Sequence, residues 1–272
     1  MPAYLDTILQ AHRAAAAADD RDEPTVLAAA AAYAQARALG QDAGQRSFAE
    51  MLRVGHSKRG MAVISEIKRR SPSKGDLDID LDPGLVAADY EAGGASCLSV
   101  LTDASFFGGS VEDLQKARSA CHLPVLRKDF TVSTLDVADA CLMGADAVLL
   151  IVAALDDATL GATLALARAL HLDALVEVHD DDELDRALAA GADLVGVNQR
   201  DLRTFEVDRA RAERMGSRMP DGVIAVAESG IRHADDVARL ADSGYTAVLV
   251  GETLVRSGDR RAAVDGLLVG SS

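Results

Sequence analysis

The sequence predicts an α/β protein: a closed (β/α)8 barrel, the TIM-barrel architecture, with an N-terminal helical extension. After residue 60, eight short runs rich in β-branched residues alternate with amphipathic stretches that are long enough to be crossover helices. The runs are continuously apolar, as is typical of parallel strands that helices cover on both faces. The predicted strands are 62–68, 96–101, 124–130, 146–152, 174–178, 194–198, 223–228 and 247–250.

A recurring glycine also indicates eight units. Gly-Gly-Ala-Ser at Gly93, Gly-Ala-Asp at Gly144 and Gly191, and Ser-Gly-Tyr at Ser243 each precede a predicted strand, at intervals of about 50 residues. Glycine readily adopts the left-handed conformation that ends a helix. Because an interval of that size corresponds to two βα units, the series favours a closed barrel over an open doubly wound sheet.

The first 60 residues do not follow this alternation. Ala-rich helix formers at 4–18 and 25–39 flank a turn, and 47–53 predicts one more short helix before the first strand. Residues 1–60 have too little bulky apolar content for a core of their own. We therefore expect them to form an extension, over the mouth or an end of the barrel, and residues 61–272 to form the barrel domain.

Composition and charge argue against several classes of function. The 272 residues carry a formal net charge of −15 with no basic tail, which argues against nucleic acid or an anionic membrane as a partner. The longest apolar run, 147–155, is well short of the ~20 residues that cross a bilayer, and no signal peptide is recognisable. We expect a cytoplasmic protein, a monomer or weak homo-oligomer, whose local cations bind an anionic small molecule.

The cysteines and histidines do not predict a metal site. Cys97, Cys121 and Cys141 lack ligand spacing, so we expect buried free thiols. His179 shares a strand face with Glu177 and could tune that carboxylate, but we expect a solvated loop histidine. The sequence also lacks a P-loop and a G-x-G-x-x-G motif, and neither a metal nor a cofactor is predicted. The other histidines considered, also without ligand spacing, are His56, His122, His171 and His233.

Polar residues gather where the predicted strands end, which is where βα barrels carry their reactive groups. Glu66 and Lys68 project to one side of the first strand, because alternate residues of a strand share a face. Each charge alone would have an ordinary explanation, such as a surface ion pair. A closed barrel would bring all of them to one mouth, where they would be costly to desolvate without a function. The set comprises Glu66, Lys68, Lys128, Glu177, Asn198, Arg200 and Glu228.

Two glycine-containing loops predict a phosphate site. Ser229 and Gly230 follow the seventh strand and Gly251 follows the eighth, in the two loops that commonly bind phosphate in such barrels. Glycine lets backbone N–H groups approach an anion closely. Glu252 would repel the phosphate unless its side chain turns away, so we expect main-chain contacts alone at that loop.

With these residues identified, the chain resembles the indole-3-glycerol phosphate synthase family along nearly its whole length. The resemblance implies a reaction of tryptophan biosynthesis. In it, 1-(2-carboxyphenylamino)-1-deoxyribulose 5-phosphate closes to indole-3-glycerol phosphate with loss of CO2 and water. The motifs that carry the resemblance are E-I-K-R-R-S-P-S-K-G, F-F-G-G-S, P-V-L-R-K-D-F, G-A-D-A-V-L-L-I-V, L-V-E-V-H, G-V-N-Q-R-D-L, A-E-S-G-I and V-G-E-T-L.

The resemblance also implies roles for individual residues. Lys128 would be the general acid, Glu177 the general base and Lys68 the cation for the substrate carboxylate. We expect the cations of the mouth to depress one another's proton affinity and so to lower the pKa of a lysine. Residues that would hold the lysines and substrate in register are Glu66, Asn198, Arg200 and Glu228. The phosphate would bind at Ser71, Ser229, Gly230 and Gly251, and the aromatic ring would lie among Phe107, Phe130 and Leu149.

Two other functions remain as alternatives. Another phosphate-binding barrel, such as phosphoribosylanthranilate isomerase, would share the two glycine loops but would not need Glu66, Lys68 and Lys128 together. A barrel without catalysis could bind a phosphorylated metabolite or a protein partner. The composition of residues 71–77 further predicts a mobile loop that closes over the ligand.

Overall fold

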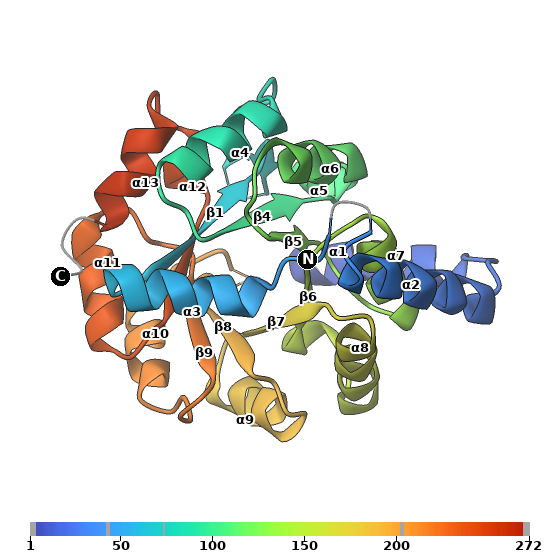
Figure 1. Cartoon of the computed structure of the whole chain (residues 1–272). Coiled ribbons are helices and arrows are strands. Elements are labelled where there is room, and N and C mark those ends of the chain that lie inside the picture. The colour runs from blue at the N-terminus through green and yellow to red at the C-terminus, as the bar shows by residue number, and fades with distance from the viewer. Residues whose placement is uncertain (1–3, 42–43, 73, 202–203, 269–272) are drawn as a thin grey trace.

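The structure is a computed structural model that describes residues 4–41, 44–72, 74–201 and 204–268. Eight parallel strands form a closed barrel, because the last strand pairs with the first through Ala62 and Ala247 (Figure 1). The closed (β/α)8 barrel is thereby confirmed, and the open doubly wound sheet is wrong. The barrel strands are β1 Ala62–Ile67, β4 Cys97–Leu101, β5 Val125–Lys128, β6 Ala147–Ile151, β7 Asp173–Val178, β8 Leu194–Asn198, β9 Ile224–Glu228 and β10 Ala247–Val250.

The apolar runs locate these strands to within two residues at each end. Every residue of β1, β4, β6, β8, β9 and β10 is buried. Continuous burial follows from the architecture, since one face of each strand packs inside the barrel and the other packs against helices. The strands therefore form a rigid frame for the residues at their ends.

Helices follow the strands and cover the outside of the barrel (Figure 1). Several begin at a side chain that accepts a backbone N–H of the first turn, as Asp82 does from Gly84 and Leu85. The covering helices are α4 Pro83–Ala92, α6 Val111–Ala120, α7 Thr134–Leu142, α8 Asp157–Ala169, α9 Asp181–Ala189, α10 Arg209–Gly216, α11 Ala234–Asp242 and α13 Arg260–Leu268.

Short elements lie in the loops that follow the strands. After β1, the strands β2 (Arg70–Ser71) and β3 (Gly75–Asp76) form an antiparallel hairpin. The loop that we expect to be mobile, 71–77, includes residue 73, which lies outside the described residues, and its mobility stays a prediction. The other short elements are α5 Ala104–Phe107, η1 Val152–Ala154 and α12 Glu252–Val255.

The recurring glycine ends a helix before every second barrel strand. Gly94, Gly144, Gly191 and Gly244 have φ of 94°, 90°, 84° and 89°, and they precede β4, β6, β8 and β10. In the first repeat it is the second glycine that is left-handed, since Gly93 has φ of −77°. The spacing of two βα units is thus confirmed.

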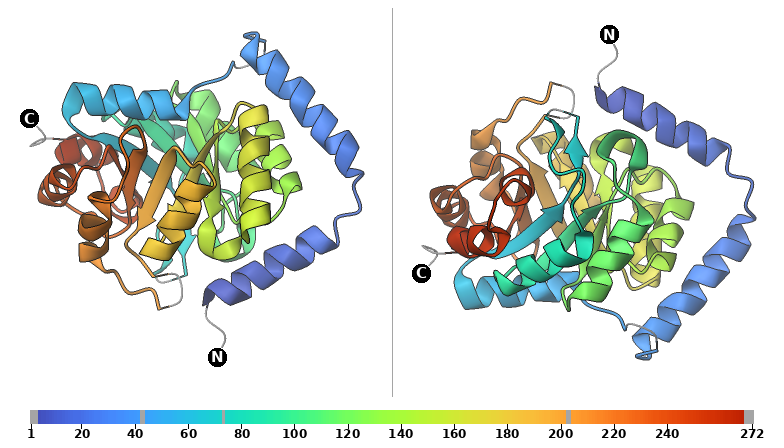
Figure 2. Two further views of the ribbon diagram at one scale, coloured as in Figure 1. Left: turned by 90° about the horizontal axis from the view of Figure 1, so that it is seen from below. Right: turned by 90° about the horizontal axis from the view of Figure 1, so that it is seen from above.

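The N-terminal extension forms three helices that run from one end of the barrel to the other (Figure 2). α3 (Phe48–Arg59) lies at the amino ends of the strands, where Phe48 and Leu52 are completely buried. It is longer than predicted, because its polar last turn continues to Gly60, whose φ is 75°. α2 (Glu23–Ala38) packs along α7, and α1 (Tyr4–Ala17) returns to the mouth. The division at residue 60 stays a prediction.

Two predictions about the whole chain concern thiols and membranes. Cys97, Cys121 and Cys141 are buried and free, as expected. Across the described ranges, every helix is too short or too polar to cross a bilayer.

Candidate active site

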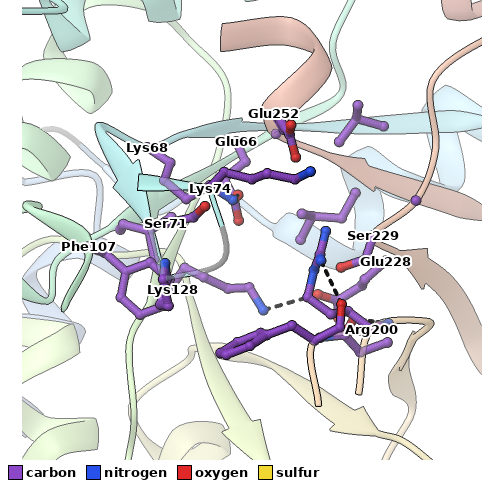
Figure 3. Close-up of a pocket in the computed structure, with 18 of the residues that line it drawn as sticks. Glu66, Lys68, Ser71, Lys74, Phe107, Lys128, Arg200, Glu228, Ser229 and Glu252 are labelled. Carbon is purple, nitrogen blue, oxygen red and sulfur yellow. Dashed lines mark hydrogen bonds and ion pairs between the residues drawn. The ribbon is translucent and has the colours of Figure 1, made fainter. Parts of the chain in front are cut away.

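A cavity of about 660 Å³ lies at the carboxyl ends of the barrel strands (Figure 3). Parallel strands of a closed barrel all end at the same face, so the residues at their ends converge there. All fourteen site residues predicted from the sequence line this cavity. They are Glu66, Lys68, Ser71, Phe107, Lys128, Phe130, Leu149, Glu177, Asn198, Arg200, Glu228, Ser229, Gly230 and Gly251.

Lys128, the last residue of β5, lies between two buried carboxylates. Its Nζ donates to Glu177 Oε2 at 2.6 Å and to Glu228 Oε2 at 3.0 Å. Burial alone would lower the pKa of Lys128, but the charges of Glu177 and Glu228 outweigh it and hold that pKa well above its usual range. The expected lowering of a lysine pKa by neighbouring cations is therefore wrong for Lys128, because its nearest charged neighbours are carboxylates.

The two carboxylates around Lys128 are not equivalent. Burial raises the pKa of Glu228 to about 7, and the charge of Glu177 adds to this effect against the opposing charge of Lys128. Burial acts on Glu177 in the same way, but Lys128 and His179 outweigh it and keep the pKa of Glu177 below its usual range. A pair of groups with separated pKa values can divide acid and base work between them. At neutral pH Glu177 is therefore ionised.

Glu66 and Lys68 form an ion pair at the end of β1. Their side chains are only 6% and 16% exposed, as expected for alternate residues that face one cavity. Gly251 lies against this pair, since a Cβ atom on Gly251 would overlap Glu66 Oε1. The glycine after β10 thus serves the packing of Glu66 as well as any approach of a ligand to the backbone.

Asn198, the last residue of β8, connects Glu177 to the next residues of the chain. Its Nδ2 donates to Glu177 Oε1 at 3.1 Å, and its Oδ1 accepts the backbone N–H of Arg200 at 3.0 Å. The guanidinium of Arg200 donates to the carbonyl oxygen of Phe205 at 3.1 Å and still lines the cavity. Asn198 therefore orients Glu177, and Arg200 remains available to a ligand at the rim.

The prediction for His179 is wrong. Its side chain is 12% exposed, not solvated, and its Nε2 lies 3.3 Å from Glu177 Oε1. Its Nδ1 lies 3.0 Å from Glu183 Oε2. The sequence signal was present, because His179 is in phase with Glu177, but helix α9 brings Glu183 over the ring and shields it from solvent.

The two glycine loops form another part of the cavity wall. Ser229 and Gly230 both have left-handed backbones, with φ of 68° and 75°. A left-handed serine is uncommon, and such strain often marks a functional turn. Glu252 begins the short helix α12, and its side chain lies 3.9 Å from the guanidinium of Arg256, one turn later. Arg256 thus partly offsets the charge that we expected to oppose a phosphate.

An apolar wall completes the cavity. The rings of Phe107 and Phe130 lie 6.3 Å apart between centroids, and Leu149 of β6 lines the same cavity. Tyr4, Leu5 and Ile8 of α1 line it as well, and their role was missed in the sequence. The available signal was the apolar stripe of Tyr4, Leu5, Ile8 and Leu9 within an otherwise Ala-rich helix. Other lining residues missed are the cations Lys74, Arg209, Arg232 and Arg256.

One group of side chains has the geometry of a metal site. The ligand atoms of His12, Asp103 and Asp129 lie within 4.8 Å of one another. His12 was not singled out in the sequence. Within the described residues these carboxylates already accept protein hydrogen bonds, Asp103 from His12 and from Phe106 N, and Asp129 from Arg127. The group joins α1 to the barrel, and the prediction of no metal stays a prediction.

The fold and this cavity define a class: an enzyme built on a (β/α)8 barrel, with its ionisable groups at the carboxyl ends of the strands. The model of the family described as "Indole-3-glycerol phosphate synthase" matches residues 5–267. The chain belongs to the indole-3-glycerol phosphate synthase family and is a carboxy-lyase.

Relatives of the same name match most of the chain. "Indole-3-glycerol phosphate synthase 2" of Streptomyces coelicolor is 52% identical over 223 residues, 82% of this chain and 85% of that protein. "Indole-3-glycerol phosphate synthase" of Beutenbergia cavernae is 49% identical over 248 residues, 91% of this chain and 89% of that protein. The protein of that name from Chromobacterium violaceum is 44% identical over 272 residues, the full length of both chains.

A solved structure supports the fold alone. "Thiamine phosphate pyrophosphorylase from Pyrococcus furiosus" superposes with a TM-score of 0.58 at 15% identity. The superposition covers 79% of this chain and all of that one.

Proposed function

We propose that this protein closes 1-(2-carboxyphenylamino)-1-deoxyribulose 5-phosphate to indole-3-glycerol phosphate, with loss of CO2 and water, in tryptophan biosynthesis. The observation that carries the proposal is the Lys128 ammonium, held between Glu177 and Glu228 inside a cavity with aromatic and cationic walls. The protein would act in the cytoplasm, as a monomer or a weak homo-oligomer.

Lys128 is the general acid of the proposed reaction. It donates a proton to the ketone oxygen as the aromatic ring attacks that carbon. Its raised pKa keeps it in the ammonium form before substrate binds, and its two carboxylate contacts fix the Nζ atom in place. Loss of CO2 then restores the aromatic ring. Such a positioned proton donor contributes roughly 10²–10⁴ to a rate.

Glu177 is the proposed general base. It removes a proton from the intermediate as water leaves. Glu177 is ionised before that step, because its pKa is below the usual range. Asn198 supports this role by donating to Oε1 at 3.1 Å, which fixes the carboxylate plane. Glu228 is the second partner of Lys128 and keeps that ammonium in the cavity.

The remaining residues bind the two charged ends of the substrate. Lys68 would exchange its ion pair with Glu66 for the carboxylate of the substrate. The phosphate would bind the backbone at Ser229, Gly230 and Gly251. Ser71 would help bind the phosphate, Arg200 would help to hold the substrate in place, and the ring would lie among Phe107, Phe130 and Leu149.

Incubation with the carboxyphenylamino substrate tests the proposal. Product should appear as indole absorbance and fluorescence, and Lys128→Ala should reduce turnover by at least about 10²-fold. Circular dichroism would show whether that variant keeps its fold. If calorimetry detects tight binding of the substrate while no indole forms over hours, the protein is a binding barrel and the proposal is wrong.

A further inference from the structure

His179 is a buried histidine that contacts the proposed base but has no part in the reaction as described above. It follows β7 directly, and its ring lies between two carboxylates, Glu177 at 3.3 Å from Nε2 and Glu183 at 3.0 Å from Nδ1. Nε2 is close to Glu177 Oε1, yet it makes no aligned hydrogen bond to any described residue. A buried polar atom left in this way is rare in folded proteins and needs an explanation.

Helix α9 fixes the orientation of the His179 ring. Asp180 accepts the backbone N–H of Glu183 at 2.8 Å and so begins the helix. Glu183 then turns back, and its Oε2 accepts both the backbone N–H of His179 at 2.8 Å and the Nδ1 hydrogen. Because Glu183 is an acceptor only, Nδ1 must carry a hydrogen. The remaining nitrogen, Nε2, is thereby directed at Glu177.

The charges around the ring favour its protonated form. The charged groups that face it are Glu177 of β7 and Glu183 of α9, whereas Lys128 of β5 and the amide of Asn198 reach it only through Glu177. A neutral ring would present a lone pair to Glu177 Oε1, which is repulsive. Burial lowers the pKa of His179, but the two carboxylates outweigh this effect and raise it to about 9.

We propose that His179 is a positioning residue for Glu177: held by Glu183, its imidazolium orients the Glu177 carboxylate for proton removal. The inference rests on the proposed role of Glu177 as base. The proposal gives Glu183 the task of holding the His179 ring. Activity would then depend on the proton of His179, although neither residue lines the cavity.

The rate of the chemical step as a function of pH tests the proposal. In single-turnover reactions the wild-type rate of indole formation should fall at high pH with an apparent pKa of about 9, as His179 loses its proton. Lys128 does not titrate there, since its pKa lies higher. His179→Gln should lower the rate about tenfold or more and should abolish that alkaline fall. Glu183→Gln should move the fall to lower pH, because it removes a charge that raises the pKa of His179.

His122→Gln is the matched control, because the side chain of His122 is 97% exposed and does not line the cavity. It should keep the wild-type rate and pH profile. A His179→Gln enzyme with the wild-type profile overturns the proposal. So does one that is slower but retains the alkaline fall, since that result indicates a structural role only. His179→Asn serves in the same comparison if the glutamine variant melts at a lower temperature.

Proton NMR of the ring in the protein without substrate provides a second test. The His179 signal should titrate at about pH 9, and at lower pH in both Glu183→Gln and Glu177→Gln. Titration near the ordinary histidine value of 6.5 overturns the proposal. A wild-type protein that makes no indole overturns the proposed function together with this inference. Turnover with an insensitive His179 overturns the inference alone.

Discussion

Gly196 of β8 and Glu228 of β9 face each other inside the barrel so closely that a Cβ atom on Gly196 would overlap Glu228 Oε1. The same Glu228 Oε1 has no hydrogen-bond partner among the residues that the structure describes, and Oε2 binds Lys128. Because Gly196 has no side chain, the middle of this buried strand leaves room for the Glu228 carboxylate. Glycine in the middle of a strand weakens that strand, and here the Glu228 side chain of the neighbouring strand explains its presence.

Gly196→Ala should displace Glu228 and with it Lys128. We expect a loss of turnover of about tenfold or more, and a loss of about 1–3 kcal/mol in the free energy of unfolding from overpacking. Gly161→Ala is the control, since a Cβ atom at that position of α8 meets nothing within 4 Å. It should stabilise the protein by about 0.5–1 kcal/mol, because alanine is the better helix former, without changing turnover. Indole formation and urea unfolding measure both effects, and wild-type turnover in Gly196→Ala would contradict the argument.

How much of this site could be predicted depends on which residues the barrel itself positions. Glu66, Lys128, Glu177 and Glu228 follow from sequence because each lies at the end of a strand, and closure of the barrel brings strand ends together. A short apolar run locates such an end almost to the residue. Closure of the barrel does not predict the position of groups that depend on docking between distant segments.

The features that the sequence did not predict depend on such contacts between distant segments. Ile8 lines the cavity because α1 docks on the mouth, and an Ala-rich helix does not specify where it docks. His179 is enclosed by Glu183 of α9, a contact across a helix start that strand periodicity does not describe. The direction of the Lys128 pKa depends on distances to Glu177 and Glu228 that only the folded barrel sets.

Ile8→Asp tests whether α1 closes the cavity. Ile8 is 2% exposed and lies between the mouth and the core, so a carboxylate there should release α1 from the barrel. We expect KM to rise about tenfold, because the substrate loses its contact with the apolar wall that α1 provides. A tenfold change corresponds to about 1.4 kcal/mol of binding free energy. kcat should change less. Thr7→Asp, at an exposed position of the same helix, should leave KM unchanged. An equal KM in both variants would show that α1 does not contribute to binding.

His12 should make the docking of α1 depend on pH. Its hydrogen bond with Asp103, together with the charges of Asp129 and Asp103, raises the pKa of His12 despite partial burial. A group whose pKa is raised on docking stabilises the docked state below its ordinary pKa of 6.5 and loses that contribution as pH rises through the raised value. Trypsin should therefore cleave after Arg13 faster at high pH than at low pH. The increase should exceed the change in the activity of trypsin itself over the same pH range. His12→Gln should remove the difference, and an unaltered pH dependence in that variant would count against His12.

Glu252 follows Gly251, at the end of the cavity where we propose that the phosphate binds. Its carboxylate is 38% exposed and only loosely paired with Arg256 at 3.9 Å, so it should weaken the binding of an anion at Gly251. Replacement by serine removes this charge and leaves Arg256 free to face the ligand. We expect Glu252→Ser to bind inorganic phosphate about two- to fivefold more tightly in calorimetry at low salt, and less so at high salt, as for an interaction of up to about 1 kcal/mol. Glu50→Ser, an equal change of charge on α3 at the other end of the barrel, should show no effect on affinity. Weaker binding in Glu252→Ser would mean instead that the carboxylate holds Arg256 in place for the phosphate, because only then does removing a negative charge reduce affinity for an anion.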